Sequence, residues 1–272
     1  MATVLKEEAF EKEESLKVAE MEKMVKGEKA EEGKEEKAVE EVRAKLEQHK
    51  VEEAKVVVEG DQKAKGKEEV GENVKMDIEP KTGVSFPVKL GDGQQLNAVG
   101  CRKKKILGLG VNIYAFGIYA DNAMLKELLK TKFSKNPENP TKELYEAVID
   151  SDISMTVRLV LVFRGLTMSL VKKNMDDGLA ASIKKLTGGQ KNEALTNKIM
   201  ADADNRIKLP PGSVIEITRL PGYVLQTKVR DELVSKVESE LLCRAYFHMY
   251  LGDDPFDMEA KERFGKSMLS LF

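Results

Sequence analysis

The residues best suited to chemistry in this sequence are an arginine and a tyrosine in two neighbouring predicted strands. Arg102 lies near the end of the first strand, predicted over residues 96–103, and Tyr114 lies in the second, predicted over residues 111–119. The second strand is apolar on both faces, so we expect it to be buried on both sides. A buried tyrosine hydroxyl needs a hydrogen-bond partner. A guanidinium and a phenol aimed into apolar surroundings form a receptor for one carboxylate or one polarised carbonyl.

Other kinds of site have weaker support in the sequence. Gly108 and Gly110 resemble the start of a dinucleotide-binding loop, but the third glycine is missing and a strand follows instead of a helix. The two histidines and two cysteines do not have the spacing of a zinc site, and no catalytic triad is readable. We therefore expect no metal, no cofactor and no catalytic residue of these types.

Lysines follow Arg102 directly, from Lys103 to Lys105. A nucleic-acid surface would need further basic and aromatic neighbours, and the nearby aromatic residues belong to the buried strand. We interpret the three lysines as a solvated turn and expect no nucleic-acid partner. Alternation along a strand can still direct Arg102 to the opposite face from its neighbour.

The clearest strand covers residues 153–163, where apolar residues at odd positions alternate with more polar ones. Arg158 interrupts its polar face. It is either a second ligand contact or a member of a structural ion pair, and the sequence leaves both open.

The remaining elements alternate between strand and helix patterns. Thr167 is a candidate cap for a long helix that ends at Leu186. Further helices are predicted over residues 123–131, 141–148, 192–204, 237–250 and 258–271, and a hairpin over 213–229. Strands that cluster at both ends of a helical region predict an α+β fold, an open sandwich with an antiparallel sheet and a layer of helices.

The first 75 residues differ from the rest of the chain. About half of them are charged, and Phe10 is their one aromatic residue. We expect residues 1–75 to form a disordered, solubilising tail, with a partner-docking helix as the alternative and the partner unknown. Residues 76–272 are long enough to form one sizeable core.

The sequence contains no apolar run as long as a membrane span, and its Glu-rich start resembles neither a signal peptide nor a transit peptide. A cytoplasmic protein is the expectation. Cys101 and Cys243 are then two buried thiols, although a disulfide remains open.

Several stretches in order along residues 76–272 resemble the plant chalcone isomerase superfamily, and most of all its fatty-acid-binding members. They are Glu79–Pro87, Arg102–Lys104, Tyr114–Asp121, Met155–Leu159, Leu241–Arg244 and Gly252–Asp257. The resemblance implies an open-faced β-sandwich, in which a large antiparallel sheet is backed by a layer of helices and the ligand lies between them. It also implies the chloroplast stroma as an alternative location.

The resemblance also assigns roles to individual residues. In catalytic members an arginine polarises the enone carbonyl of a chalcone, a threonine and a tyrosine organise water around it, and an asparagine helps to hold the product. Arg102 falls on that arginine and Tyr114 on the threonine. An ungapped placement of the helix puts Leu170 at the tyrosine and Asp177 at the asparagine. The water network of the enzyme is therefore expected to be lost.

In the fatty-acid-binding members an arginine and a tyrosine hold a carboxylate, and this chain has that pair. The resemblance therefore implies a non-catalytic protein that binds a medium- to long-chain fatty acid. We expect the strand over residues 153–163 to supply apolar wall, with Met155 or Met168 as adaptable contacts. A chalcone-to-flavanone isomerase and a non-catalytic helper of flavonoid biosynthesis are the alternatives.

Overall fold

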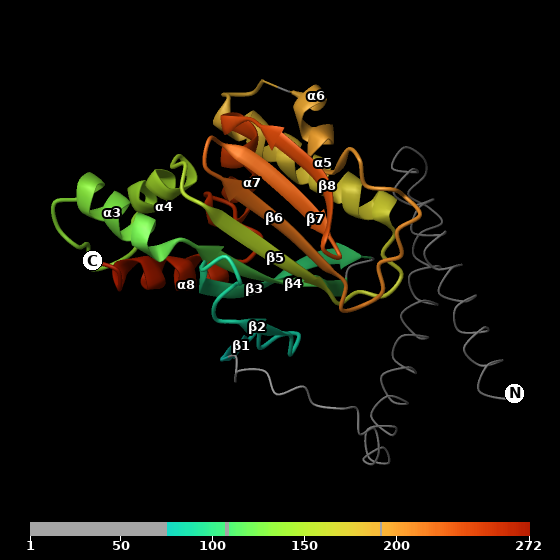
Figure 1. Cartoon of the computed structure of the whole chain (residues 1–272), viewed down its shortest axis with the longest axis horizontal. Coiled ribbons are helices and arrows are strands. Elements are labelled where there is room, and N and C mark those ends of the chain that lie inside the picture. Colours follow the sequence, from blue (N-terminus) through green and yellow to red (C-terminus); the bar gives the residue numbers. More distant parts are fainter. Residues whose placement is uncertain (1–74, 107–108, 191) are drawn as a thin grey trace, which may run out of the picture. The chain divides into compact units, whose positions relative to one another are not determined.

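A six-stranded antiparallel sheet forms the centre of the protein in the computed structural model, which describes residues 75–106, 109–190 and 192–272 (Figure 1). Each strand pairs with the next one along the chain. They are β3 (Gln95–Ile106), β4 (Leu109–Ala120), β5 (Met155–Leu161), β6 (Val214–Leu220), β7 (Val224–Val229) and β8 (Glu232–Glu238). The predicted tail, residues 1–75, lies outside the described residues apart from Lys75.

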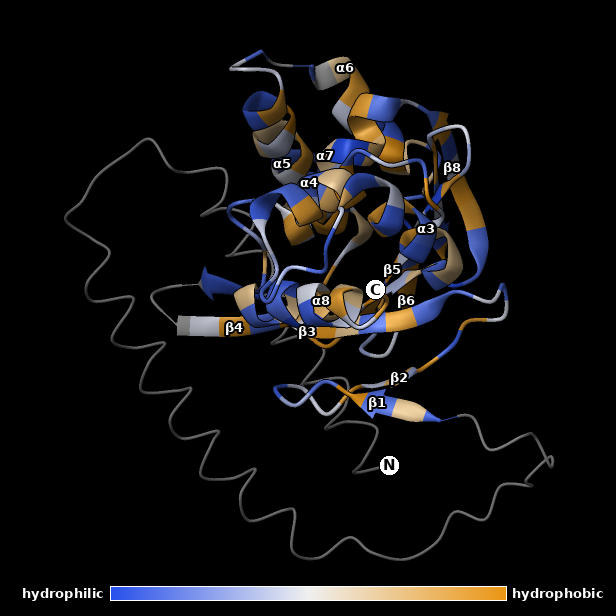
Figure 2. Cartoon of the chain, turned by 90° about the vertical axis from the view of Figure 1, so that its left-hand side faces the viewer, coloured by the Kyte–Doolittle hydropathy of each residue, from blue (hydrophilic) through white to orange (hydrophobic). Residues whose placement is uncertain are grey.

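Helices cover one face of this sheet, as Figure 2 shows in side view. The long α5 (Met168–Leu186) packs on α7 (Glu240–Leu251), and α8 (Met258–Leu269) packs along β3. The others are α3 (Asn122–Lys132), α4 (Lys142–Ile149), α6 (Glu193–Thr196) and a 3₁₀ turn, η1 (Asn197–Met200). This is the α+β fold expected from the sequence, with a large antiparallel sheet backed by helices. None of the described helices is both long and apolar enough to cross a membrane.

Two short strands, β1 (Met76–Ile78) and β2 (Ser85–Pro87), lie on the other side of the sheet (Figure 2). Phe86 is fully buried there and packs with Val99 and Ala115, whose side chains point away from the helices. β4 is therefore buried on both faces, as its apolar sequence predicts.

The odd-numbered residues of β5 face the core, as the alternation of apolar and polar residues predicts. Met155, Val157, Leu159 and Leu161 are all buried in the core between sheet and helices. The predicted cap of α5 is also present, because the Thr167 side chain accepts a hydrogen bond from the backbone N–H of Leu170.

Two glycines allow close packing of the helices, one between β3 and α8 and the other between α5 and α7. A Cβ atom on Gly100 of β3 would lie 2.5 Å from the Cβ of Ala260 on α8, and one on Gly178 of α5 would lie 2.7 Å from the sulfur of Met249 on α7. Such contacts are too short for real Cβ atoms, so a larger residue at Gly100 would push α8 away from β3, and one at Gly178 would require the Met249 side chain to move.

Three predicted elements differ in the structure. Residues 232–238 form the edge strand β8, and α7 begins only after Ser239 caps it, whereas the prediction started a helix at Val237. The helix predicted over residues 192–204 is shorter and consists of α6 and η1. The lysines after Arg102 are not a turn, because β3 continues through them to Ile106.

A fully buried arginine on β6 fixes the end of α4. The Arg219 side chain donates hydrogen bonds to the carbonyls of Ile153 (2.8 Å), Ile149 (2.9 Å) and Val148 (3.1 Å). Its guanidinium also lies over the ring of Phe247 of α7, 4.6 Å from the ring centre. Burial lowers the pKa of Arg219 to about 10, so it stays charged at neutral pH. A cation at the carboxyl end of a helix is favourable because that end carries partial negative charge.

We expect Arg219→Met to lower the free energy of unfolding by about 2–5 kcal/mol, because three buried carbonyls lose their donor. Arg219→Lys should recover only part of this, since an ammonium lacks the planar fork of donors. Denaturant unfolding measures both. Arg158→Met is the control. The Arg158 guanidinium nitrogen lies 2.5 Å from a carboxylate oxygen of Glu216 on the outer face of the sheet, and loss of this ion pair should cost no more than about 1 kcal/mol. Equal losses in Arg219→Met and Arg158→Met would contradict this role.

Candidate ligand-binding cleft

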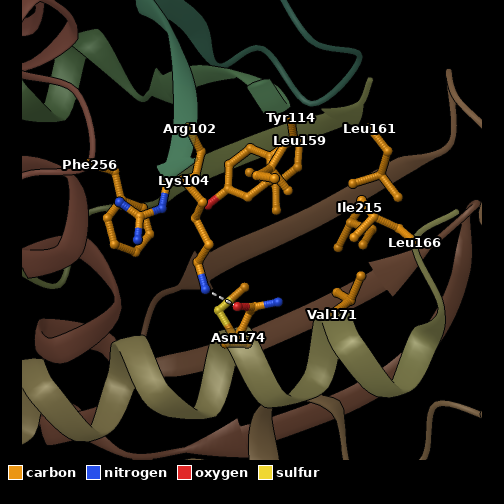
Figure 3. Close-up of a pocket in the computed structure, with 12 residues that line it drawn as sticks. Arg102, Lys104, Tyr114, Leu159, Leu161, Leu166, Val171, Asn174, Ile215 and Phe256 are labelled. Atoms are coloured by element: carbon orange, nitrogen blue, oxygen red, sulfur yellow. Dashed lines mark hydrogen bonds between the residues drawn. The ribbon is translucent and has the colours of Figure 1, made fainter. Parts of the chain in front are cut away.

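A narrow cleft lies between the sheet and α5, with Arg102 and Tyr114 at one end (Figure 3). Its apolar walls come from β4, β5 and β6 on the sheet side and from α5 and the segment before it on the other. The residues that line it are Arg102, Lys104, Ile113, Tyr114, Leu159, Leu161, Leu166, Val171, Asn174, Met175, Ile215 and Phe256.

Strand pairing places the two predicted ligand residues together. Arg102 of β3 lies directly opposite Tyr114 of β4 in the register of the sheet. Immediately beyond this pair, Lys103 lies opposite Asn112, so Ile113 has no partner and forms a β-bulge. The bulge allows the consecutive residues Ile113 and Tyr114 both to line the cleft, although regular alternation would send them to opposite faces.

An aromatic ring supports the guanidinium of Arg102. Its central carbon lies 3.7 Å from the centre of the Phe256 ring, in the segment between α7 and α8. Stacking on an aromatic face leaves the N–H groups at the guanidinium edge free to donate. The guanidinium has no hydrogen bond or ion pair with a described residue. It is a half-buried charge whose donors remain available to a ligand.

The hydroxyl of Tyr114 lies 3.4 Å from the hydroxyl of Tyr250 on α7. Burial, together with the neighbouring Tyr250, raises the pKa of Tyr114 well above 10. The phenol is therefore neutral at physiological pH and offers a ligand a hydrogen bond without adding charge. Tyr250 in turn packs edge-on against Phe116 and Phe256, with ring centres 5.0 and 5.3 Å apart.

Lys104 also reaches the cleft, although the sequence pattern predicts it to lie in a solvated turn. Residues 102 and 104 share one face of β3, and the Lys104 ammonium donates a hydrogen bond to the side-chain oxygen of Asn174 on α5 (Figure 3). Burial and the nearby Arg102 lower the pKa of Lys104. The same alternation that singles out Arg102 would have identified Lys104 if the strand had been extended past residue 103.

The cleft is tight. Its cavity volume is about 40 Å³, which is enough for a few water molecules. A longer apolar ligand requires the wall to open. Met175 of α5 has three rotatable side-chain bonds, and such a residue can adapt to a ligand of variable shape.

Comparison with known proteins agrees with the fold. The family model described as chalcone isomerase-like matches residues 83–264. The chain belongs to the chalcone isomerase-like family.

Similar proteins in this family carry two kinds of name. Chalcone isomerase-like protein 1 of Humulus lupulus is 55% identical over 202 residues, covering 74% of this chain and 94% of the relative. Fatty-acid-binding protein 1 of Arabidopsis thaliana is 36% identical over 198 residues, covering 71% of each chain. The crystal structure of an Arabidopsis thaliana fatty-acid binding protein matches with a TM-score of 0.68 at 36% identity, covering 72% of this chain and 98% of that one.

The other predicted site residues of this chalcone isomerase-like protein do not line the cleft. Arg158 lies on the outer face of β5 and pairs with Glu216, which is the structural ion pair that the sequence offered as one of its two roles. Met155 is fully buried and its sulfur contacts Arg219, and Met168 is fully buried in the core at the start of α5. Leu159 and Leu161 supply the apolar wall of β5 instead.

The two residues that the ungapped placement puts at family positions on α5 lie outside the narrow cleft. Neither Leu170 nor Asp177 lines the cleft that holds Arg102 and Tyr114, whereas Asn174, midway between them, does. Its amide is already engaged, because its nitrogen donates to the carbonyl of Leu170 (2.7 Å) and its oxygen accepts from Lys104. The side chains of α5 that line the cleft do not include a tyrosine.

The reactivity of Cys101 can show which face of β3 this residue occupies. It precedes Arg102 and is 2% exposed on the opposite face of β3, and burial raises its pKa to about 11. Cys243 is fully buried, and burial raises its pKa to about 12. Because the thiolate is the reactive form, we expect neither cysteine to react readily with Ellman's reagent at pH 8 in the folded protein, and both to react after unfolding. Rapid labelling of folded protein, lost in Cys101→Ser, would show that Cys101 faces an open surface.

Proposed function

We propose that this protein binds a fatty acid without transforming it, and serves fatty-acid metabolism by holding the carboxylate at Arg102 and Tyr114. The observation that carries the proposal is the cross-strand pair itself, at the end of a cleft with apolar walls. The guanidinium offers charged donors and the neutral phenol adds one more. An anion fits this end better than a second cation or a purely apolar group.

The energetics favour an amphiphile with one anionic end. A hydrogen bond from a charged group contributes about 1.5–3 kcal/mol. Each methylene group removed from water adds about 0.8 kcal/mol. A chain of ten or so carbons therefore gains enough to offset the displacement of side chains that a tight cleft demands. The relatives named as fatty-acid-binding proteins support this ligand class.

A non-catalytic role in flavonoid biosynthesis is the second candidate. It is favoured by the 55% identity to a chalcone isomerase-like protein that this chain covers almost completely. In that case Arg102 would face the carbonyl of a neutral aromatic ligand. Mass spectrometry of small molecules extracted from natively purified protein separates the two candidates, because a retained fatty acid and a retained phenolic compound differ in mass and absorbance.

We expect Arg102→Met to weaken laurate binding by about 1.5–3 kcal/mol, roughly ten- to a hundredfold, because the carboxylate loses its charged donor. Tyr114→Phe should cost less, about 0.5–1.5 kcal/mol, since a neutral donor is lost. Isothermal titration calorimetry measures both. Arg158→Met removes the same charge from the outer face of the sheet and should bind laurate normally. Unchanged affinity in folded Arg102→Met protein would place the carboxylate elsewhere.

We expect no isomerase activity on naringenin chalcone. The cleft-lining part of α5 does not supply a tyrosine to organise water around the carbonyl, and the amide of Asn174 is held by Lys104 and its own helix. A spectrophotometric assay follows the loss of chalcone absorbance against spontaneous cyclisation, and chiral chromatography of the product is the second readout. Rapid and stereoselective turnover that depends on the protein and is abolished by Arg102→Met would contradict this prediction and show that the protein is an isomerase.

A further inference from the structure

Two cations share the polar end of the cleft, and neither forms an ion pair with an acid among the described residues, although Asp177 of α5 lies near enough to act on Lys104. Arg102 is stacked on Phe256, and Lys104 donates to the neutral amide of Asn174. Both side chains are half-buried. Like charges that close together repel each other, and in a partly desolvated place the repulsion is weakly screened. Burial and the nearby Arg102 accordingly lower the pKa of Lys104.

The acceptor of Lys104 is fixed in orientation. The Asn174 amide nitrogen donates to the carbonyl of Leu170, one turn earlier on α5, so its oxygen is the atom turned toward β3. Lys104 thereby spans the cleft from the sheet to the helix (Figure 3). A neutral amide oxygen is a weaker partner for an ammonium than a carboxylate, because hydrogen bonds between two ionised groups are shorter and stronger.

We infer that Lys104 is a second charged ligand of the head group, so that the cleft selects an amphiphile with an anionic end over one with a neutral carbonyl or hydroxyl end. This inference rests on the proposed function and names the group that gives it charge selectivity. One oxygen of the carboxylate accepts from Arg102 and Tyr114, and the other accepts from Lys104 in place of the Asn174 amide.

The surroundings of Lys104 allow a hydrated head group. Beyond Arg102 and Lys104 the cleft continues into a more polar hollow of about 290 Å³, between α5 and the segment that follows α7. The charged and titratable residues that line this hollow are Arg102, Lys104, Asp177, Lys185, His248 and Asp254. Asp254 is paired with Lys185, 3.3 Å away, and Asp177 is exposed on α5. Neither acid forms an ion pair with Lys104.

Lys103 provides a matched control. It is the neighbouring residue on the same strand, carries the same side chain, and is exposed on the opposite face of β3. Lys104→Met and Lys103→Met therefore remove the same charge from the same part of the protein, one inside the cleft and one outside it. Lys104→Arg keeps the charge and serves as the conservative variant.

The experiment measures the affinity of the full chain for laurate and for 1-dodecanol by isothermal titration calorimetry, with thermal melts to establish folding. We expect Lys104→Met to weaken laurate binding about five- to twentyfold and to leave dodecanol binding unchanged, because only the anion contacts the ammonium. Lys103→Met should change neither, and Lys104→Arg should retain most of the laurate affinity.

A pH series gives a readout that a merely structural lysine would not move. Above neutral pH laurate stays ionised and Tyr114 stays neutral, because its pKa lies well above 10. Lys104 loses its charge as pH rises through its lowered pKa, so laurate affinity should fall in alkaline solution. Lys173 and Asp177 of α5 also act on Lys104, and they remain in every variant. The fall should persist in Lys103→Met and flatten in Lys104→Met.

The outcomes separate this inference from the proposed function. If Arg102→Met loses laurate binding while folded Lys104→Met binds laurate as tightly as the natural chain, the inference is wrong and the proposed function stands. If Lys104→Met weakens laurate and dodecanol equally, Lys104 shapes the cleft without selecting charge, and the inference is again wrong. If the natural chain binds no laurate, the proposed function itself fails.

Discussion

The register between β3 and β4 is the constraint on which the candidate site depends. It sets Arg102 opposite Tyr114, and the bulge at Ile113 adds an apolar neighbour to the same face. A shift of β3 by one residue along β4 would turn Arg102 away from the helices while Tyr114, on a strand also paired with β5, stayed on their side. The register is held by burial on both faces of β4, since Phe116 and Ile118 pack under the helices while Ala115 packs against Phe86. The polar end of the cleft is therefore a product of apolar packing.

Burying a charged side chain costs desolvation free energy, and the protein contains two arginines that are accommodated in different ways. Arg219 is fully buried and donates to backbone carbonyls, so its charge is used to join β6 to the end of α4. Arg102 lies on an aromatic ring and keeps its donors uncommitted. The first arrangement satisfies the guanidinium internally and serves stability. The second leaves it unsatisfied, which is the condition for binding something from outside.

The sequence predicts which face of a strand a side chain occupies more reliably than it predicts the tertiary contacts of that side chain. Alternation separated Arg102 from Lys103 and placed the odd residues of β5 in the core, because a period of two is a local property of a strand. Alternation does not show how far along β5 the cleft extends. The sequence therefore predicts Met155 as a ligand contact, whereas Leu159 and Leu161 line the cleft. Phe256 and Asn174 meet Arg102 and Lys104 through tertiary packing of distant segments, for which no local pattern exists. The strand β8 is not predictable from its sequence, ELVSKVE, because this charged edge strand has weak apolar alternation.

The stacking of Arg102 on Phe256 joins two distant parts of the chain. The strands of the sheet pair in chain order, but helices intervene between β4 and β5 and between β5 and β6, so only the pairings β3–β4, β6–β7 and β7–β8 are local in sequence. Phe256 follows α7 and reaches the guanidinium only after the C-terminal helices have docked on that sheet. The polar end of the cleft is thus complete only in the fully folded domain. A molecule bound there draws its affinity from both parts at once, so occupancy and global folding are thermodynamically linked. The free energy of unfolding of the bound protein then rises with the logarithm of the ligand concentration.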